Sequence, residues 1–281
     1  MEKLTNIFLL LSKPYGITSR KYLNEVGKVL GENKIGHTGT LDPMATGLLF
    51  VAVGQFTRLI PYVKLDSKEY FIEITFGIET DTWDITGKQL KLVEPHVKEE
   101  DILKVLPQFV GDVTQKVPFF SAKKFKGVEL YKLARKEVLV EVFKPARIDG
   151  IEYIRFKDDK LVLRVSCEKG TYMRSLAYEI GLALGVPATL SAISRTKIGD
   201  LTIGDSTTLN RLKKGDFSKG CIAPEAVIPL ETVIIKEGSG FKRGEKTEIS
   251  TVLVFDENKN FIGIAELKGE LKPRIIINGN H

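Results

Sequence analysis

Cysteine and histidine are scarce in this chain of 281 residues, which contains two cysteines and three histidines. Cys167 and Cys221 lie in different segments, so we expect two free thiols in a reducing compartment rather than a disulfide. The cysteines and histidines form no metal-ligand spacing such as Cys-x-x-Cys, His-x-x-x-His or His-Glu-x-x-His. We therefore predict neither a structural nor a catalytic metal, and no cofactor.

Long apolar runs are also missing. No stretch approaches the roughly 18 to 20 apolar residues that cross a bilayer. The run at 7–11 is too short for a signal-peptide core, and Lys13 and Pro14 follow it without a small-residue cleavage site. We interpret this run as a buried strand and predict a cytoplasmic protein without a membrane partner.

Several phosphate-binding and hydrolytic motifs are absent as well. Neither Gly-x-Gly-x-x-Gly nor the Walker sequence Gly-Lys-Ser/Thr occurs, which argues against an enzyme driven by a nucleotide. The Gly-x-Ser-x-Gly turn of α/β-hydrolases is missing too, so a serine triad of that type is not supported.

Positive charge, by contrast, is present and localised. The formal net charge is +6, and the segment 115–147 alone has nine basic and three acidic residues, so the rest of the chain is neutral in sum. The basic residues are Lys116, Lys123, Lys124, Lys126, Lys132, Arg135, Lys136, Lys144 and Arg147. Phenylalanines and a tyrosine are interleaved with them. Such a combination indicates a polyanionic partner, with nucleic acid as the natural candidate because aromatic rings can stack on unpaired bases.

Hydrophobic periodicity predicts a mixture of strands and helices. We expect strands at 7–11, 48–53, 68–77, 138–143, 148–156 and 160–167, helices at 19–30, 98–110, 128–136 and 171–184, helical spacing to 63, and a loop at 34–47. Without a regular βαβ rhythm, this order indicates an α+β fold with a largely antiparallel mixed sheet flanked by helices. After Pro229 short strands predominate, including a hairpin at 252–264. We therefore predict a domain over 1–230 and a small β-rich domain over 231–281.

The loop 36–47 is the most unusual stretch of the chain. Three glycines within twelve residues, Gly36 and Gly39 among them, permit backbone conformations closed to other residues. Proline follows Asp42 and restricts it to extended geometry, and His37 lies on the same loop. A carboxylate and an imidazole on one rigid loop suit an active site. An Asp-Pro pair also commonly begins a plain turn, and spacing alone does not choose between the two readings.

Seven short segments carry a family resemblance. They are KPYGITS at 13–19, GHTGTLDPMATG at 36–47, KEY at 68–70, TDTWDITG at 80–87, PFFSAKKFKG at 118–127, LYKLAR at 130–135 and GTYMRSL at 170–176. In this order they resemble the TruB family, which makes pseudouridine in the T arm of tRNA. The resemblance runs from about 10 to 201, and 252–267 is similar to the family's small PUA domain. It implies a pseudouridine synthase fold over 1–230 and a PUA-like RNA-binding domain over 231–281.

The resemblance also implies roles for three central residues. Asp42 would be the nucleophile, Tyr70 would stack on the target base and assist proton transfer, and Arg174 would pair with Asp42. An arginine suits this pairing because its fork holds a carboxylate and stays charged, whereas desolvation opposes an isolated buried carboxylate. Judged without the resemblance, Tyr70 could be a core residue and Arg174 an exposed arginine at a helix end. Which carbon Asp42 attacks, or whether a glycal forms, stays open.

The remaining predicted site residues bind or organise. His37 would fill the gap left by the extracted uridine, and Lys13 would support Tyr70 and its surroundings. Ile193 would lie beside the base, where the family commonly has leucine, and Met173 replaces a usual isoleucine. The predicted tRNA-gripping residues are Lys123, Lys124, Lys126 and Tyr131, and the predicted structural residues are Asp84, Gly36 and Gly39.

The predicted activity is conversion of uridine to pseudouridine at position 55 in the T-arm loop of tRNA, by a monomer without guide RNA. Base flipping is required because C1′ and C5 are hidden in the folded loop. Two alternatives remain: a synthase that depends on guide RNA, and a non-catalytic RNA-binding protein that assists tRNA folding.

Overall fold

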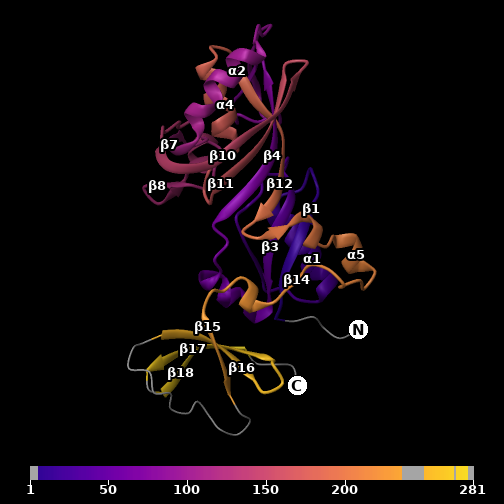
Figure 1. Cartoon of the computed structure of the whole chain (residues 1–281). Coiled ribbons are helices and arrows are strands. Elements are labelled where there is room, and N and C mark those ends of the chain that lie inside the picture. Colours follow the sequence, from indigo (N-terminus) through magenta and orange to yellow (C-terminus); the bar gives the residue numbers. More distant parts are fainter. Residues whose placement is uncertain (1–5, 236–249, 269, 278–281) are drawn as a thin grey trace.

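The computed structural model describes residues 6–235, 250–268 and 270–277. A ten-stranded sheet is its central element (Figure 1). The main path of the sheet runs β14 (Cys221–Ile222), β1 (Phe8–Lys13), β3 (Thr46–Val53), β12 (Ala188–Ile198), β4 (Ser67–Phe76), β11 (Lys160–Glu168), β10 (Phe143–Lys157) and β7 (Gly111–Lys116). Two short strands lie off this path, β2 (Ile35–Thr38) beside β3 and β13 (Leu201–Thr202) beside β12. Every pair is antiparallel except β3 with β12, so the predicted α+β class with a largely antiparallel sheet is confirmed.

Helix α1 (Ser19–Leu30) shows how local sequence sets an element. The Thr18 side chain accepts the Lys21 N–H at the helix start, and Gly31 ends the helix at φ 66°. The buried face of α1 packs on one face of β1 and β3, and the short helix α5 (Leu209–Lys213) adds Leu212 to this core. The predicted helix and both of its boundaries are confirmed.

The opposite half of the sheet is covered by helix α4 (Met173–Ala183). Its Leu176 and Ile180 pack with Ile72 and Ile74 of β4 in one buried cluster. Tyr70 belongs to the same face of β4, as the alternating pattern predicts. This cluster places the first turn of α4 against the middle of the sheet.

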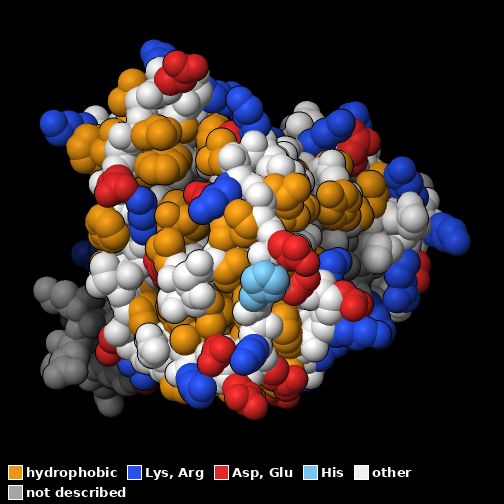
Figure 2. All heavy atoms as spheres, turned by 90° about the horizontal axis from the view of Figure 1, so that it is seen from above, with side chains coloured by type: hydrophobic (Ala, Val, Ile, Leu, Met, Phe, Trp, Pro, Cys, Tyr) orange, Lys and Arg blue, Asp and Glu red, His pale blue; other side chains and the backbone are white. Residues whose placement is uncertain are grey.

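Smaller helices and hairpins complete this part. They are the 3₁₀ helices η1 (Gly54–Tyr62), η2 (Leu106–Phe109), η3 (Ile203–Asp205) and η4 (Pro224–Ala226), helices α2 (Glu99–Val105) and α3 (Leu130–Ala134), and strand pairs β5 (Ile78–Thr80) with β6 (Gln89–Leu92) and β8 (Lys124–Phe125) with β9 (Val128–Glu129). On the end face seen from above the view of Figure 1, acidic and basic side chains are mixed between hydrophobic ones (Figure 2). The net positive charge is therefore not gathered on that face.

Four predicted elements differ from the structure. The predicted loop 34–47 contains β2, residues 138–142 lie outside any strand, the predicted helix 98–110 divides into α2 and η2, and 54–62 is 3₁₀ rather than α-helical. Pro107 interrupts the predicted helix 98–110, because proline has no N–H to donate to an interior hydrogen bond of the helix. Strand β12 was not predicted, because two register shifts interrupt the alternation of its buried and exposed residues.

The chain ends in a four-stranded sheet of β15 (Glu231–Ile235), β16 (Ser250–Asp256), β17 (Phe261–Lys268) and β18 (Glu270–Ile276). The predicted hairpin between β16 and β17 is confirmed. This sheet lies at the opposite end of the molecule from α2 (Figure 1). Leu253 and Ile264 pack with Phe8 and Leu10 of β1, so both sheets share a core.

Two further findings concern side chains and membranes. Cys167 is buried and Cys221 is exposed, and both thiols are free, as predicted. Within the part of the chain that the structure describes, no helix has the length and apolar character needed to span a membrane.

Candidate active site

A cleft of about 630 Å³ opens where the loop after β2, the strands β4 and β12, and the start of α4 meet. The predicted site residues that line it are Gly39, Asp42, Tyr70, Lys123, Tyr131, Arg174 and Ile193. These residues are up to 154 positions apart in sequence, between Gly39 and Ile193. The fold thus brings the three residues with predicted central roles to one cavity.

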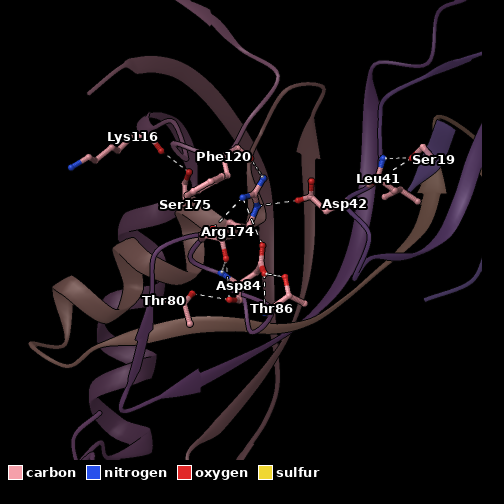
Figure 3. Close-up of polar contacts among 11 residues, drawn as sticks. Ser19, Leu41, Asp42, Thr80, Asp84, Thr86, Lys116, Phe120, Arg174 and Ser175 are labelled. Atoms are coloured by element: carbon pink, nitrogen blue, oxygen red, sulfur yellow. Dashed lines mark hydrogen bonds and ion pairs between the residues drawn. The ribbon is translucent and has the colours of Figure 1, made fainter. Parts of the chain in front are cut away.

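An ion pair between Asp42 and Arg174 spans this cleft (Figure 3). Arg174 Nε lies 3.0 Å from Asp42 Oδ2, and the exposed fractions of the two side chains are 6% and 44%. The guanidinium also donates to the backbone carbonyls of Thr82 at 3.1 Å and Phe120 at 3.2 Å. The arginine is therefore fixed in a buried position, while the carboxylate remains open to the cleft.

Asp84 lies behind the same arginine. Its Oδ2 is 3.8 Å from Arg174 Nη1, and its Oδ1 accepts the Thr86 hydroxyl at 2.5 Å and the Thr86 N–H at 3.0 Å. The Thr80 hydroxyl donates to the Asp84 carbonyl at 2.7 Å. Asp84 thus orders the loop after β5, as expected, and also places a second carboxylate beside Arg174 (Figure 3).

Hydrogen bonds from helix α1 and from within the loop fix the backbone around Asp42. Ser19, the first residue of α1, exchanges two hydrogen bonds with the Leu41 backbone, at 2.9 and 3.0 Å (Figure 3). The Ala45 N–H donates to the Asp42 carbonyl at 3.0 Å and closes a turn. Ser19 was missed from the sequence as a residue of this site, because its contact with Leu41 spans 22 positions.

Lys13 contacts this loop rather than Tyr70. Its ammonium group, almost completely buried, donates to the carbonyls of Pro14 and Ile17 at 2.8 Å and of Pro43 at 3.4 Å. Burial lowers the pKa of Lys13 to about 8, and the Asp42 carboxylate partly opposes this shift. Lys13 was expected to support Tyr70 and its surroundings, and its hydrogen bonds lie in the surroundings, where they position the turn that contains Asp42.

Tyr70 lies in the cleft wall with 7% of its surface exposed. Burial raises the pKa of its phenol, and the nearby positive charge of Arg195 opposes that rise. The phenol is therefore protonated at neutral pH. Arg195 was missed from the sequence, although it is 1% exposed and donates at 2.8 Å to both the Leu48 and Gly39 carbonyls.

Two glycines are required by this packing. Gly39 has φ 66°, and a Cβ there would lie 3.2 Å from Arg195 Nη1. Gly47 has φ 97°, and a Cβ there would meet the Arg195 carbonyl oxygen at 2.2 Å. Gly36, predicted with Gly39 to be structural, lies in β2 against the Ile60 side chain, which leaves 3.0 Å for a Cβ.

His37 lies on β2, outside the residues that line the cleft. Its Nε2 is 3.2 Å from the Thr40 hydroxyl. Burial, and then the positive charges of Arg20 and Arg195, lower the pKa of His37. The imidazole is thus neutral at neutral pH and accessible beside the aspartate loop.

The basic segment forms an arm of β8, β9 and α3 beside the cleft. Lys123 and Tyr131 line the cavity, whereas Lys124 and Lys126 are exposed outside it. The aromatic rings of the arm are only partly exposed. Phe125, for example, is half-buried, and the Lys126 ammonium lies 5.5 Å from the centre of its ring. The arm therefore has cations on its surface, whereas most of the surface of its aromatic rings is covered by other residues.

Two solved structures share the fold of the whole chain. A structure described as a Cbf5-Nop10-Gar1 complex has a TM-score of 0.67 and 24% identity, over 99% of this chain and 85% of the other. An H/ACA RNP bound to a substrate RNA containing 2′-deoxyuridine has a TM-score of 0.66 and 23% identity, over 97% and 85%. The likeness at these identities concerns the fold, which is that of the pseudouridine synthases.

The sequence comparisons narrow this class to one family. The model described as TruB family pseudouridylate synthase (N terminal domain) matches residues 27–173. A protein named tRNA pseudouridine synthase B from Francisella philomiragia is 38% identical over 282 residues, which cover 95% of this chain and 93% of that protein. A protein of the same name from Caldanaerobacter subterraneus is 38% identical over 279 residues, covering 93% and 95%. The chain belongs to the TruB family and is an isomerase of the pseudouridine synthase class.

Proposed function

We propose that this enzyme converts uridine to pseudouridine at position 55 in the T loop of tRNA, with Asp42 as the nucleophile. The observation that carries the proposal is the Asp42 carboxylate, 44% exposed in the cleft and held 3.0 Å from a buried arginine. The name shared by relatives that align over more than nine-tenths of their length supports tRNA as the substrate.

The reaction breaks the C1′–N1 bond, rotates the uracil and forms a C1′–C5 bond, with loss of the C5 proton to solvent and protonation of N1. A carboxylate can attack and later depart, as in covalent catalysis by retaining glycosidases. Arg174 keeps Asp42 oriented through a fork that is itself fixed by two backbone carbonyls. The carboxylate can begin this exchange by attack on the sugar, by attack on the base, or through elimination to a glycal.

Tyr70 and Ile193 would hold the flipped uracil, since both line the cleft beside Asp42. Burial raises the pKa of the Tyr70 phenol and so keeps it protonated. The primary role of its ring would therefore be to stack on the bound base. To remove the C5 proton, Tyr70 would have to be a phenolate. The positive charge of Arg195 favours the phenolate because it lowers the pKa of Tyr70. His37, neutral and half-buried at the cleft's edge, would stack in the place of the flipped base.

The arm and the C-terminal sheet would hold the rest of the tRNA. Lys123, Lys124, Lys126 and Tyr131 would contact its backbone and unpaired bases. We further propose that residues 1–230 form the catalytic domain and 231–281 a small PUA-like RNA-binding domain. We also propose that the enzyme is a monomer that acts without guide RNA.

The test is tritium release from unmodified tRNA labelled at uracil C5, with purified protein and no guide RNA. Release at position 55 is expected, and its absence from folded tRNA would refute the stand-alone enzyme. Asp42→Asn should abolish release while tRNA binding persists. Turnover by Asp42→Asn would refute the nucleophile, and a wild-type protein that binds but never releases tritium would support a folding role instead.

A further inference from the structure

Two cations that are buried or half-buried in the wall of the cleft have no acidic partner within 4 Å among the described residues. Lys68, on β4, and Arg195, on β12, both line the cavity. Within the described residues, the Lys68 ammonium has no hydrogen bond or ion pair, and Arg195 donates only to neutral oxygens. A half-buried ammonium without a counter-ion is costly, so an unpaired lysine in a cleft indicates a ligand that supplies negative charge.

The two cations converge on a single point of the aspartate loop. A Cβ built on Gly39 would lie 3.2 Å from Arg195 Nη1 and 3.4 Å from Lys68 Cε. Lys68 also lies two positions before Tyr70, on the same face of β4, and Arg195 is the cross-strand partner of Tyr70. The unpaired charge is therefore adjacent to the ring against which the base would stack.

Two further cations of the cleft wall have acidic partners, and a third, Lys123, is exposed to solvent. Arg174 pairs with Asp42 at 3.0 Å, and Lys169 pairs with Asp66 at 2.7 Å. Asp42 and Asp66 are the acidic residues that line the cavity, so neither carboxylate is left for Lys68. The excess positive charge next to Tyr70 is a property of the assembled cleft and remains until an anion enters.

We propose that Lys68 binds the phosphodiester of the target nucleotide, with the buried charge of Arg195 reinforcing the site. This inference rests on the proposed function, because the phosphate reaches Lys68 only when the base of the same nucleotide lies against Tyr70. Lys68 would thus be a substrate-binding residue that selects a flipped nucleotide, since an unflipped one leaves its phosphate outside the cleft.

The environment of Lys68 adds a measurable signature. Burial, together with the charge of Arg195, lowers the pKa of Lys68 to about 8. The groups that face it are Arg195 and Lys169, which lower the pKa, and Asp66 and Cys167, which raise it. A bound phosphate favours the charged form, so RNA binding takes up a proton, and affinity falls as pH rises above about 8.

The experiment measures RNA affinity in an Asp42→Asn background, which prevents turnover. Lys68→Met should weaken binding of an unmodified T stem-loop roughly tenfold and reduce the salt slope by about 1. Lys160→Met is the matched control, because Lys160 begins the neighbouring strand β11 at its far end and pairs with Glu73. Lys68→Arg should bind normally and lose the fall in affinity between pH 7 and 9.

A second RNA locates the phosphate. In a stem-loop with an uncharged methylphosphonate at the target nucleotide, Lys68→Met should add little further loss, so the two changes couple. Equal effects of Lys68→Met on both RNAs, or unchanged affinity and salt slope, would overturn the proposal. A loss of kcat with unchanged affinity in otherwise active enzyme would also overturn it by placing Lys68 at the reacting base. Failure of the proposed function would appear separately, as absent tritium release by the wild type.

Discussion

At the scale of single residues, Arg174 is the most constrained side chain of the site. It contacts the carboxylates of Asp42 and Asp84 and the carbonyls of Thr82 and Phe120 from a 6% exposed position. Its planar fork serves these acceptors in different directions at once. A lysine has the same charge but concentrates it on one nitrogen, which cannot serve all four partners.

Arg174→Lys should therefore lower turnover at saturating tRNA on the order of 100-fold, because a displaced carboxylate loses its attacking geometry. Single-turnover tritium release measures this rate without the contribution of product release. Arg164→Lys is the control, since the Arg164 side chain is 40% exposed, lies outside the cleft and pairs with Glu152. If Arg174→Lys retained at least half of the wild-type rate, the positioning role would be wrong.

At the scale of elements, the arm and the sheet present different kinds of side chain. The arm of β8, β9 and α3 presents exposed lysines, whereas β4 and β12 present Tyr70 and Ile193 to the cavity. Lys124 and Lys126 lie outside the cavity, so under the proposed function their charges would contact the RNA backbone away from the reacting base. Binding strength and the chemical step should therefore respond to different substitutions.

Lys124→Gln combined with Lys126→Gln should weaken tRNA binding and reduce its salt slope by about 1.5 to 2, because each phosphate contact releases counter-ions. The rate at saturating tRNA should stay within about twofold of wild type. Titrations at several salt concentrations test the slope, and the double Lys→Arg variant, which keeps both charges, should restore it. An unchanged slope in the Gln variant would exclude the arm from RNA contact.

At the scale of the whole molecule, the two sheets are joined by a common hydrophobic core. Leu253 of β16 is completely buried and packs with Phe8 and Phe50 of the main sheet. Val252, its neighbour in sequence, is equally buried but faces the separate core of the small sheet. Alternation along one strand thus divides β16 between two cores.

Leu253→Ala should destabilise the protein by about 2–5 kcal/mol, because it removes buried methyl groups and leaves a cavity between the sheets. Hydrogen exchange should show faster opening of amides in β1 and β3 as well as in β16. In Val252→Ala, accelerated exchange should stay within the C-terminal sheet. Identical exchange patterns in both variants would contradict the shared core.

Much of this enzyme was predictable from its sequence, where the signal is local or is carried by ordered motifs. The helix at 19–30, the strand at 68–77 and the β16–β17 hairpin depend on neighbouring residues, and each is confirmed. The motif order identified the family and brought Asp42 and Arg174 forward as a pair, which the structure places 3.0 Å apart.

The tertiary structure alone decided which charges remain unpaired and which backbone each buried cation holds. Arg195 donates to carbonyls 147 and 156 positions away, and it lies on a strand whose bulges hide its period. Lys13 turned out to hold the Asp42 loop, and Lys68 to face the cleft without a partner. No local pattern encodes these contacts, because the cost of burying a cation depends on groups that only the folded chain assembles.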